Sequence, residues 1–123
     1  MEKITDYVKE KTEKCLAIHD EYLDAFNNSE FDTFLSLIAE KHYKNEKMLT
    51  FFRNLITYID YVTKEELVEY FENAKNKFVK ARLTNNPVNF STNPMTNLIR
   101  LWNFELYAEI IIEIDILLSK CKK

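Results

Sequence analysis

The chain has 123 residues, an apolar content of 46% and a formal net charge of −3, which is enough for one globular domain with a real core. It contains no glycine and two prolines, which disfavours tight hairpin turns and glycine-rich phosphate loops and favours long helices. The mild acidity argues against a dedicated nucleic-acid-binding domain, and the two cysteines, Cys15 and Cys121, do not make the dense disulfide framework of small secreted proteins.

Two helices are predicted in the first part of the chain. The first runs from Glu2 to Phe26, because apolar residues recur at spacings of three and four, and Asn27 to Ser29 end it. Ser29 followed by Asp32 resembles a capping box, so a short second helix is expected to begin there and to fade between His42 and Asn45. Its inner face is formed by four apolar side chains: Phe31, Phe34, Leu35 and Ile38.

Asn45 is predicted to cap a third helix, with Glu46 in its first turn. One bent helix in place of the second and third is the alternative, because no strong breaker separates them. The sequence Thr63 to Glu66 forms the clearest capping box in the chain and predicts a fourth helix that continues to about Leu83.

Residues 84–97 form the one long predicted loop, with five asparagines and two prolines. Asn93 and Pro94 are expected to be the N-cap and first residue of a last helix over 94–120. Fifteen of the twenty-one residues from Leu98 to Leu118 are apolar, which is typical of a helix with neighbours on several sides. The prediction is therefore an all-α single domain over 1–123, a compact bundle of four to five helices with the C-terminal helix central.

Two groups of acids are candidate Mg²⁺ ligands. The first is Glu105, Glu109 and Glu113 on the last helix, and the second is Glu65, Glu66, Glu69 and Glu72 at the start of the fourth. They resemble the paired acidic motifs of MazG-type nucleotide pyrophosphatases. However, that pattern needs an acid three residues after a glutamate, and Ala108, Ile112 and Ile116 stand at those positions. Solvated helix stripes are the preferred interpretation, no cofactor is predicted, and a Mg²⁺-dependent helical hydrolase is kept as an alternative function.

Histidine and cysteine chemistry is sparse. His19 and His42 are the only histidines and are expected to lie at or near the surface. Cys15 and His19 are four residues apart and could share a helix face, but nucleophilic catalysis also needs an orienting group and an oxyanion pocket. No catalytic residue is therefore assigned, and an enzyme is not favoured.

Basic residues cluster twice, and aromatic neighbours could stack on bases. The clusters are Lys41, Lys44, Lys47 and Arg53, and Lys75, Lys77, Lys80 and Arg82. Acids are interleaved, so a solvated face is preferred and a nucleic-acid-associated accessory protein remains an alternative.

The leading hypothesis is a small non-catalytic protein that binds another protein, of the inhibitor, immunity or accessory-subunit type. Residues of AT-rich codons are abundant, which hints at a phage or another mobile element. The predicted contact surface is the 84–97 loop with the adjoining helix end, comprising Arg82, Asn86, Val88, Phe90 and Met95. Phe90 could instead fold back as a plug over the bundle end.

A homodimer in the cytoplasm is the expected state of the protein. Apolar residues outside the main helix stripes leave faces that a second copy would cover. Lys3, Asp6 and Lys9 interrupt any apolar run near the start, so no secretory signal peptide is expected. A membrane-spanning helix over 94–120 is disfavoured, because four acids would lie within the span.

Overall fold

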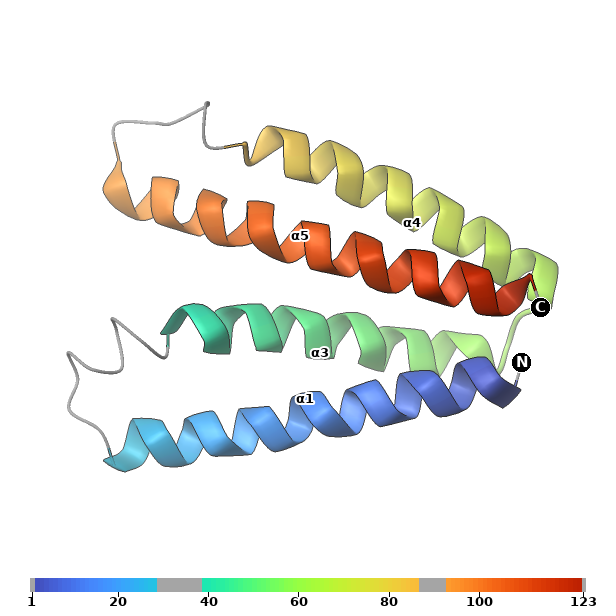
Figure 1. The fold of residues 1–123 in the computed structure, drawn as a ribbon, viewed down its shortest axis with the longest axis horizontal. Coiled ribbons are helices and arrows are strands. Elements are labelled where there is room, and N and C mark those ends of the chain that lie inside the picture. Colours follow the sequence, from blue (N-terminus) through green and yellow to red (C-terminus); the bar gives the residue numbers. More distant parts are fainter. Residues whose placement is uncertain (1, 29–38, 87–92, 123) are drawn as a thin grey trace. The chain divides into compact units, whose positions relative to one another are not determined.

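The structure, a computed structural model, describes residues 2–28, 39–86 and 93–122, and these are almost entirely helical, with a short turn over 60–63 and no strand among them (Figure 1). The described part of the chain thus confirms the predicted all-α class. The expected short helix over 31–38 lies outside the described residues. Contacts divide the chain into two compact units, Glu2–Tyr61 and the residues from Val62 onward, and each is described by itself.

The first unit is an antiparallel pair of helices, α1 (Glu2–Asn28) and α3 (Ala39–Ile59), which pack along most of their length (Figure 1). On α1, Val8, Thr12 and Cys15 are buried at alternating spacings of four and three, as expected for a helix that presents one seam to a neighbour. The Thr12 hydroxyl donates to the Val8 carbonyl at 2.8 Å, so this buried polar group is satisfied within its own helix. The buried residues of α3 are Leu49, Phe51, Phe52, Leu55 and Ile59.

The predicted break between His42 and Asn45 is wrong, because α3 is continuous from Ala39 to Ile59. Asn45 lies inside the helix and caps nothing. Its Nδ2 donates to the Cys15 carbonyl at 2.9 Å, so an amide that usually favours a helix end is satisfied across the hairpin instead.

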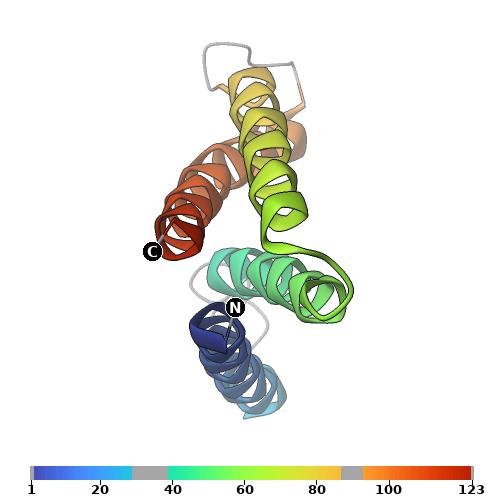
Figure 2. The same ribbon diagram turned by 90° about the vertical axis from the view of Figure 1, so that its right-hand side faces the viewer.

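The second unit pairs α4 (Lys64–Thr84) with α5 (Pro94–Cys121), again antiparallel (Figures 1 and 2). Both predicted helix starts are confirmed. Thr63 and Glu66 form a reciprocal capping box, and the Asn93 side chain accepts hydrogen bonds from the two backbone N–H groups that follow Pro94.

Isoleucines alternate with acids from Ile112 to Ile116, a pattern that on its own would also fit a strand. Ile114 is fully buried whereas Ile112 is 58% exposed, and both lie within the continuous helix α5, as predicted. The buried side of α5 is made by Leu106, Ile110, Ile114, Leu117, Leu118 and Cys121. The central position of α5 and the single domain over 1–123 stay predictions.

Candidate functional site

The end of the α4–α5 hairpin next to residues 87–92 carries several large apolar side chains in contact with solvent. Leu83, in the last turn of α4, is 60% exposed, and Met95, in the first turn of α5, is 62% exposed. Val79, Leu98, Ile99 and Leu101 are also exposed. We call Leu83, Met95 and Leu98 the hairpin-end surface, because all three are exposed toward this end of the hairpin, where the first turns of α5 extend past the end of α4 (Figure 1).

The stretch of sequence that includes this end of the hairpin is basic. From residue 73 to residue 104 the sequence contains five cationic residues and no acid, in a chain whose net charge is −3. The cations are Lys75, Lys77, Lys80, Arg82 and Arg100. Lys75 forms an ion pair with Asp115 on α5 at 2.7 Å, while Lys77 and Lys80 are exposed.

Arg82 is held against the neighbouring helix. Its guanidinium lies 3.8 Å from the centre of the Phe104 ring, and its Nε donates to the Phe104 carbonyl at 3.0 Å. These contacts leave Arg82 half-buried, so its planar group stacks on an aromatic face and also satisfies a backbone acceptor.

The other predicted contact residues have different surroundings. Asn86 is half-buried and its N–H donates to the Leu83 carbonyl at 3.2 Å, whereas Met95 is exposed. Val88 and Phe90 lie outside the described residues, so the choice between an anchor and a plug at Phe90 stays open.

The acids considered as metal ligands on α5 are distributed along one side of the helix. Glu105 and Glu109 are exposed and Glu113 is half-buried. Further along α5, an open groove is lined by Ile112, Asp115, Ile116, Ser119 and Lys120. Among the described residues, the side chains that gather at metal-ligand spacing are others, on the α1–α3 hairpin.

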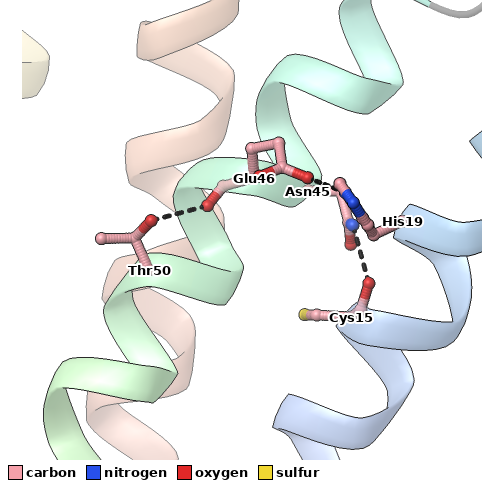
Figure 3. Close-up of polar contacts among 5 residues, drawn as sticks. All are labelled: Cys15, His19, Asn45, Glu46 and Thr50. Atoms are coloured by element: carbon pink, nitrogen blue, oxygen red, sulfur yellow. Dashed lines mark hydrogen bonds and ion pairs between the residues drawn. The ribbon is translucent and has the colours of Figure 1, made fainter. Parts of the chain in front are cut away.

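That second cluster consists of His19 from α1 and His42 and Glu46 from α3 (Figure 3 draws His19 and Glu46). One potential ligand atom from each side chain lies within 4.8 Å of the other two. His42 and Glu46 are four residues apart on a continuous helix, so both project from one face, toward α1. Nδ1 of His19 is hydrogen-bonded to Oε1 of Glu46.

The cluster is anchored from both helices. The hydrogen bond from the Asn45 side-chain amide to the Cys15 carbonyl fixes α3 against α1 one turn away from His19 (Figure 3). The rings of His19 and His42 are 5.8 Å apart, and Tyr22 meets His42 edge to face at 5.9 Å. Burial raises the pKa of Tyr22 above its usual value, with a smaller contribution from the charge of Glu21, so the phenol next to His42 is neutral at physiological pH.

One atom of the cluster has no partner. Nδ1 of His42 is buried and has no hydrogen-bond partner among the described residues. Buried nitrogens are normally satisfied, so this atom requires an explanation such as a bound water or ion. By contrast, the side chains of His19 and Glu46 are 29% and 39% exposed, which leaves the cluster accessible from solvent.

Sequence reasoning missed this cluster because it placed a helix break at the residues that build it. The spacing His42-x-x-x-Glu46 was visible, but it forms one face only if the helix is continuous. The position of His19 opposite that face depends on the register of the α1–α3 hairpin, which no local pattern determines.

No known protein family, curated protein or solved structure matches this chain significantly. Among the described helices, none combines the length and the apolar character that crossing a membrane requires.

Proposed function

We propose that this protein is non-catalytic and acts by binding another protein, as an inhibitor, an immunity factor or an accessory subunit. The observation that carries the proposal is the hairpin-end surface, where Leu83, Met95 and Leu98 are exposed beside a segment with five cations and no acid. Exposed apolar side chains with a charged surround are typical of interaction sites.

The charge of this surface favours an acidic partner. A protein segment with apolar anchors flanked by carboxylates, such as an acidic amphipathic helix, would complement both its apolar and its basic groups. Lys77 and Lys80 would accelerate the encounter, while Leu83 and Met95 would supply the buried contact area.

A nucleic acid is a weaker fit to the same surface. Phosphate contacts need several accessible cations, yet only Lys77 and Lys80 of the five are exposed, since Lys75 is paired with Asp115 and Arg82 is held at Phe104. Solvent-exposed Leu83 and Met95 have no role in a phosphate contact. A nucleic-acid-associated accessory protein therefore remains the second candidate function, and a Mg²⁺-dependent hydrolase is the third candidate.

The proposal also includes a homodimer, a cytoplasmic location, a phage or mobile-element origin and a central α5 in a four- to five-helix bundle. These expectations come from the sequence. A second copy of the chain is one possible outcome of the binding experiment below.

The test is affinity capture from source cells with matched surface variants, followed by cross-linking and mass spectrometry. Leu83→Ser with Met95→Ser removes the two apolar contacts at exposed positions, where substitutions usually alter stability by less than about 0.5 kcal/mol. Ile112→Ser, at an equally exposed position in the opposite half of α5, is the control. We expect the wild type and the control to retain one partner, cross-linked at α4 or α5 through an acidic segment, and the double variant to lose it.

Two results would contradict the proposal. One is retention of the partner by the double variant at wild-type level. The other is a partner that disappears after nuclease treatment, with binding that falls steeply with salt, which would favour nucleic acid. A melting temperature that rises with Mg²⁺ in the wild type but not in Glu105→Gln would favour the hydrolase.

A further inference from the structure

We propose that His19, His42 and Glu46 bind a divalent transition-metal ion of the zinc class. This site lies on the α1–α3 hairpin and uses none of the residues of the partner surface proposed above. Its three side chains come from two helices, and their potential ligand atoms already lie within 4.8 Å of one another.

The donor set selects the metal. Two imidazoles and one carboxylate suit Zn²⁺, Fe²⁺, Co²⁺ or Ni²⁺, whereas Mg²⁺ and Ca²⁺ prefer sites made of oxygen atoms. Three protein ligands leave a fourth position for water, as in zinc sites that remain open to solvent. The partial exposure of His19 and Glu46 provides a route of entry for the ion.

Binding of a metal ion would require small movements of the three side chains. Zinc lies about 2.0–2.2 Å from nitrogen and oxygen ligands, so tetrahedral ligand atoms are about 3.4 Å apart. The present spread of up to 4.8 Å therefore exceeds the tetrahedral spacing by at most about 1.4 Å, a difference that side-chain rotations can close. His19 and Glu46 already face each other, with Nδ1 hydrogen-bonded to Oε1, so the metal would replace the proton between them and the two ligand atoms would move apart to the tetrahedral spacing.

The buried nitrogen of His42 supports the same assignment independently. Its Nδ1 has no hydrogen-bond partner among the described residues, and either coordination or a water bound next to the metal would satisfy it. A purely structural His19–Glu46 pair would leave this atom unexplained.

The experiment uses the full chain without an affinity tag, because a histidine tag would bind the same metals. Zn²⁺ binding is measured by competition with a chromophoric chelator, and melting is followed with and without Zn²⁺. We expect one Zn²⁺ per chain and a melting temperature higher by about 5 °C at saturation. Glu46→Gln and His42→Ala should each weaken binding by about 10-fold or more.

Glu40→Gln is the matched control. Glu40 is a carboxylate on the same helix, paired with Lys44 at 3.0 Å and outside the cluster, so its loss should leave Zn²⁺ affinity unchanged. His19 and His42 are the only histidines, so ring-nitrogen NMR signals report both ligands directly. In the wild-type protein both sets of signals should shift together when Zn²⁺ is added. This measurement does not depend on whether the substituted variants fold.

Three results would overturn the proposal. The first is the absence of Zn²⁺ binding when Zn²⁺ is present in 100-fold excess over about 1 µM protein. The second is equal affinity in wild type, Glu46→Gln and His42→Ala, which would indicate an adventitious site. The third is a thiolate charge-transfer band when Co²⁺ is added, because it would assign the ion to Cys15 or Cys121.

Discussion

At the residue scale, Arg82 shows how one side chain fixes the register of a helix pair. It stacks on Phe104 and donates to the backbone carbonyl of the same residue, so it contacts α5 through two different parts of its guanidinium. We predict that Arg82→Ala lowers the free energy of unfolding by about 1–2 kcal/mol, because it removes a cation–π contact and a charge-assisted hydrogen bond.

Urea unfolding checks this prediction, and Arg82→Lys is the informative companion. Lysine keeps the charge but not the planar stacking group, so it should recover less than half of the lost stability. An Arg82→Ala protein with wild-type stability and weakened partner binding would instead make Arg82 a contact residue of the proposed interface.

Cys121 is a second residue whose environment predicts a measurable effect. Burial raises the pKa of its thiol above the usual value of 9.0, an effect that the charge of Lys64 partly opposes. Because the pKa of the thiol is higher in the folded than in the unfolded protein, the neutral thiol contributes stability that is fully present below pH 9. This contribution is lost as the pH rises through the pKa of the folded state. We therefore expect stability to fall above pH 9, and to fall less in Cys121→Ala.

The measurement is the urea midpoint as a function of pH between 7 and 11 for both proteins. Tyr22, whose pKa burial also raises, titrates in the same direction in both, so the difference between the two curves isolates Cys121. Parallel curves would mean that the thiol contributes nothing to the alkaline loss.

At the element scale, isoleucines within a single turn of α5 differ strongly in burial. We predict that Ile114→Ala and Leu117→Ala, both at fully buried positions, each cost about 2–5 kcal/mol of unfolding free energy. Ile111→Ala should cost less, because Ile111 is half-buried, and Ile112→Ala should cost under about 1 kcal/mol. Chemical denaturation of the four variants gives the comparison, and similar costs at Ile112 and Ile114 would contradict the assigned orientation of α5.

The elements also show what the sequence could and could not predict. Helix starts with side-chain caps, such as Thr63 and Asn93, are predictable because capping is local chemistry. The prediction for Asn45 is wrong because it interprets the residue as the N-cap of a new helix, whereas its amide is satisfied by Cys15, thirty residues away. The His19, His42 and Glu46 cluster was missed for the same reason, since it depends on contacts across a hairpin.

At the scale of the whole molecule, exposed apolar residues bear on self-association. Phe51 lies outside the main apolar stripe of α3 in the sequence, but it is buried and so does not support an interface. Tyr61, at 85% exposure, and Leu23, at 43%, do remain in contact with solvent. We predict a dimer at tens of micromolar, which sedimentation equilibrium would detect and Leu23→Ser would weaken; a monomer across the whole concentration range would count against it.

The prediction of a single domain has its own test, because contacts divide the chain into two compact units. The first unit, Glu2–Tyr61, has 60 residues, and a chain of that size buries only about 60% of its surface and is marginally stable alone. We therefore expect one cooperative unfolding transition for the whole chain. Leu55→Ala in the first unit and Ile114→Ala in the second should each shift that transition as a whole. Hydrogen exchange provides the measurement: each variant should lower amide protection in all four helices by the same free energy, while Ile112→Ala should lower it in none. Loss of protection confined to the unit that carries the substitution would show two independently folding hairpins in place of one domain.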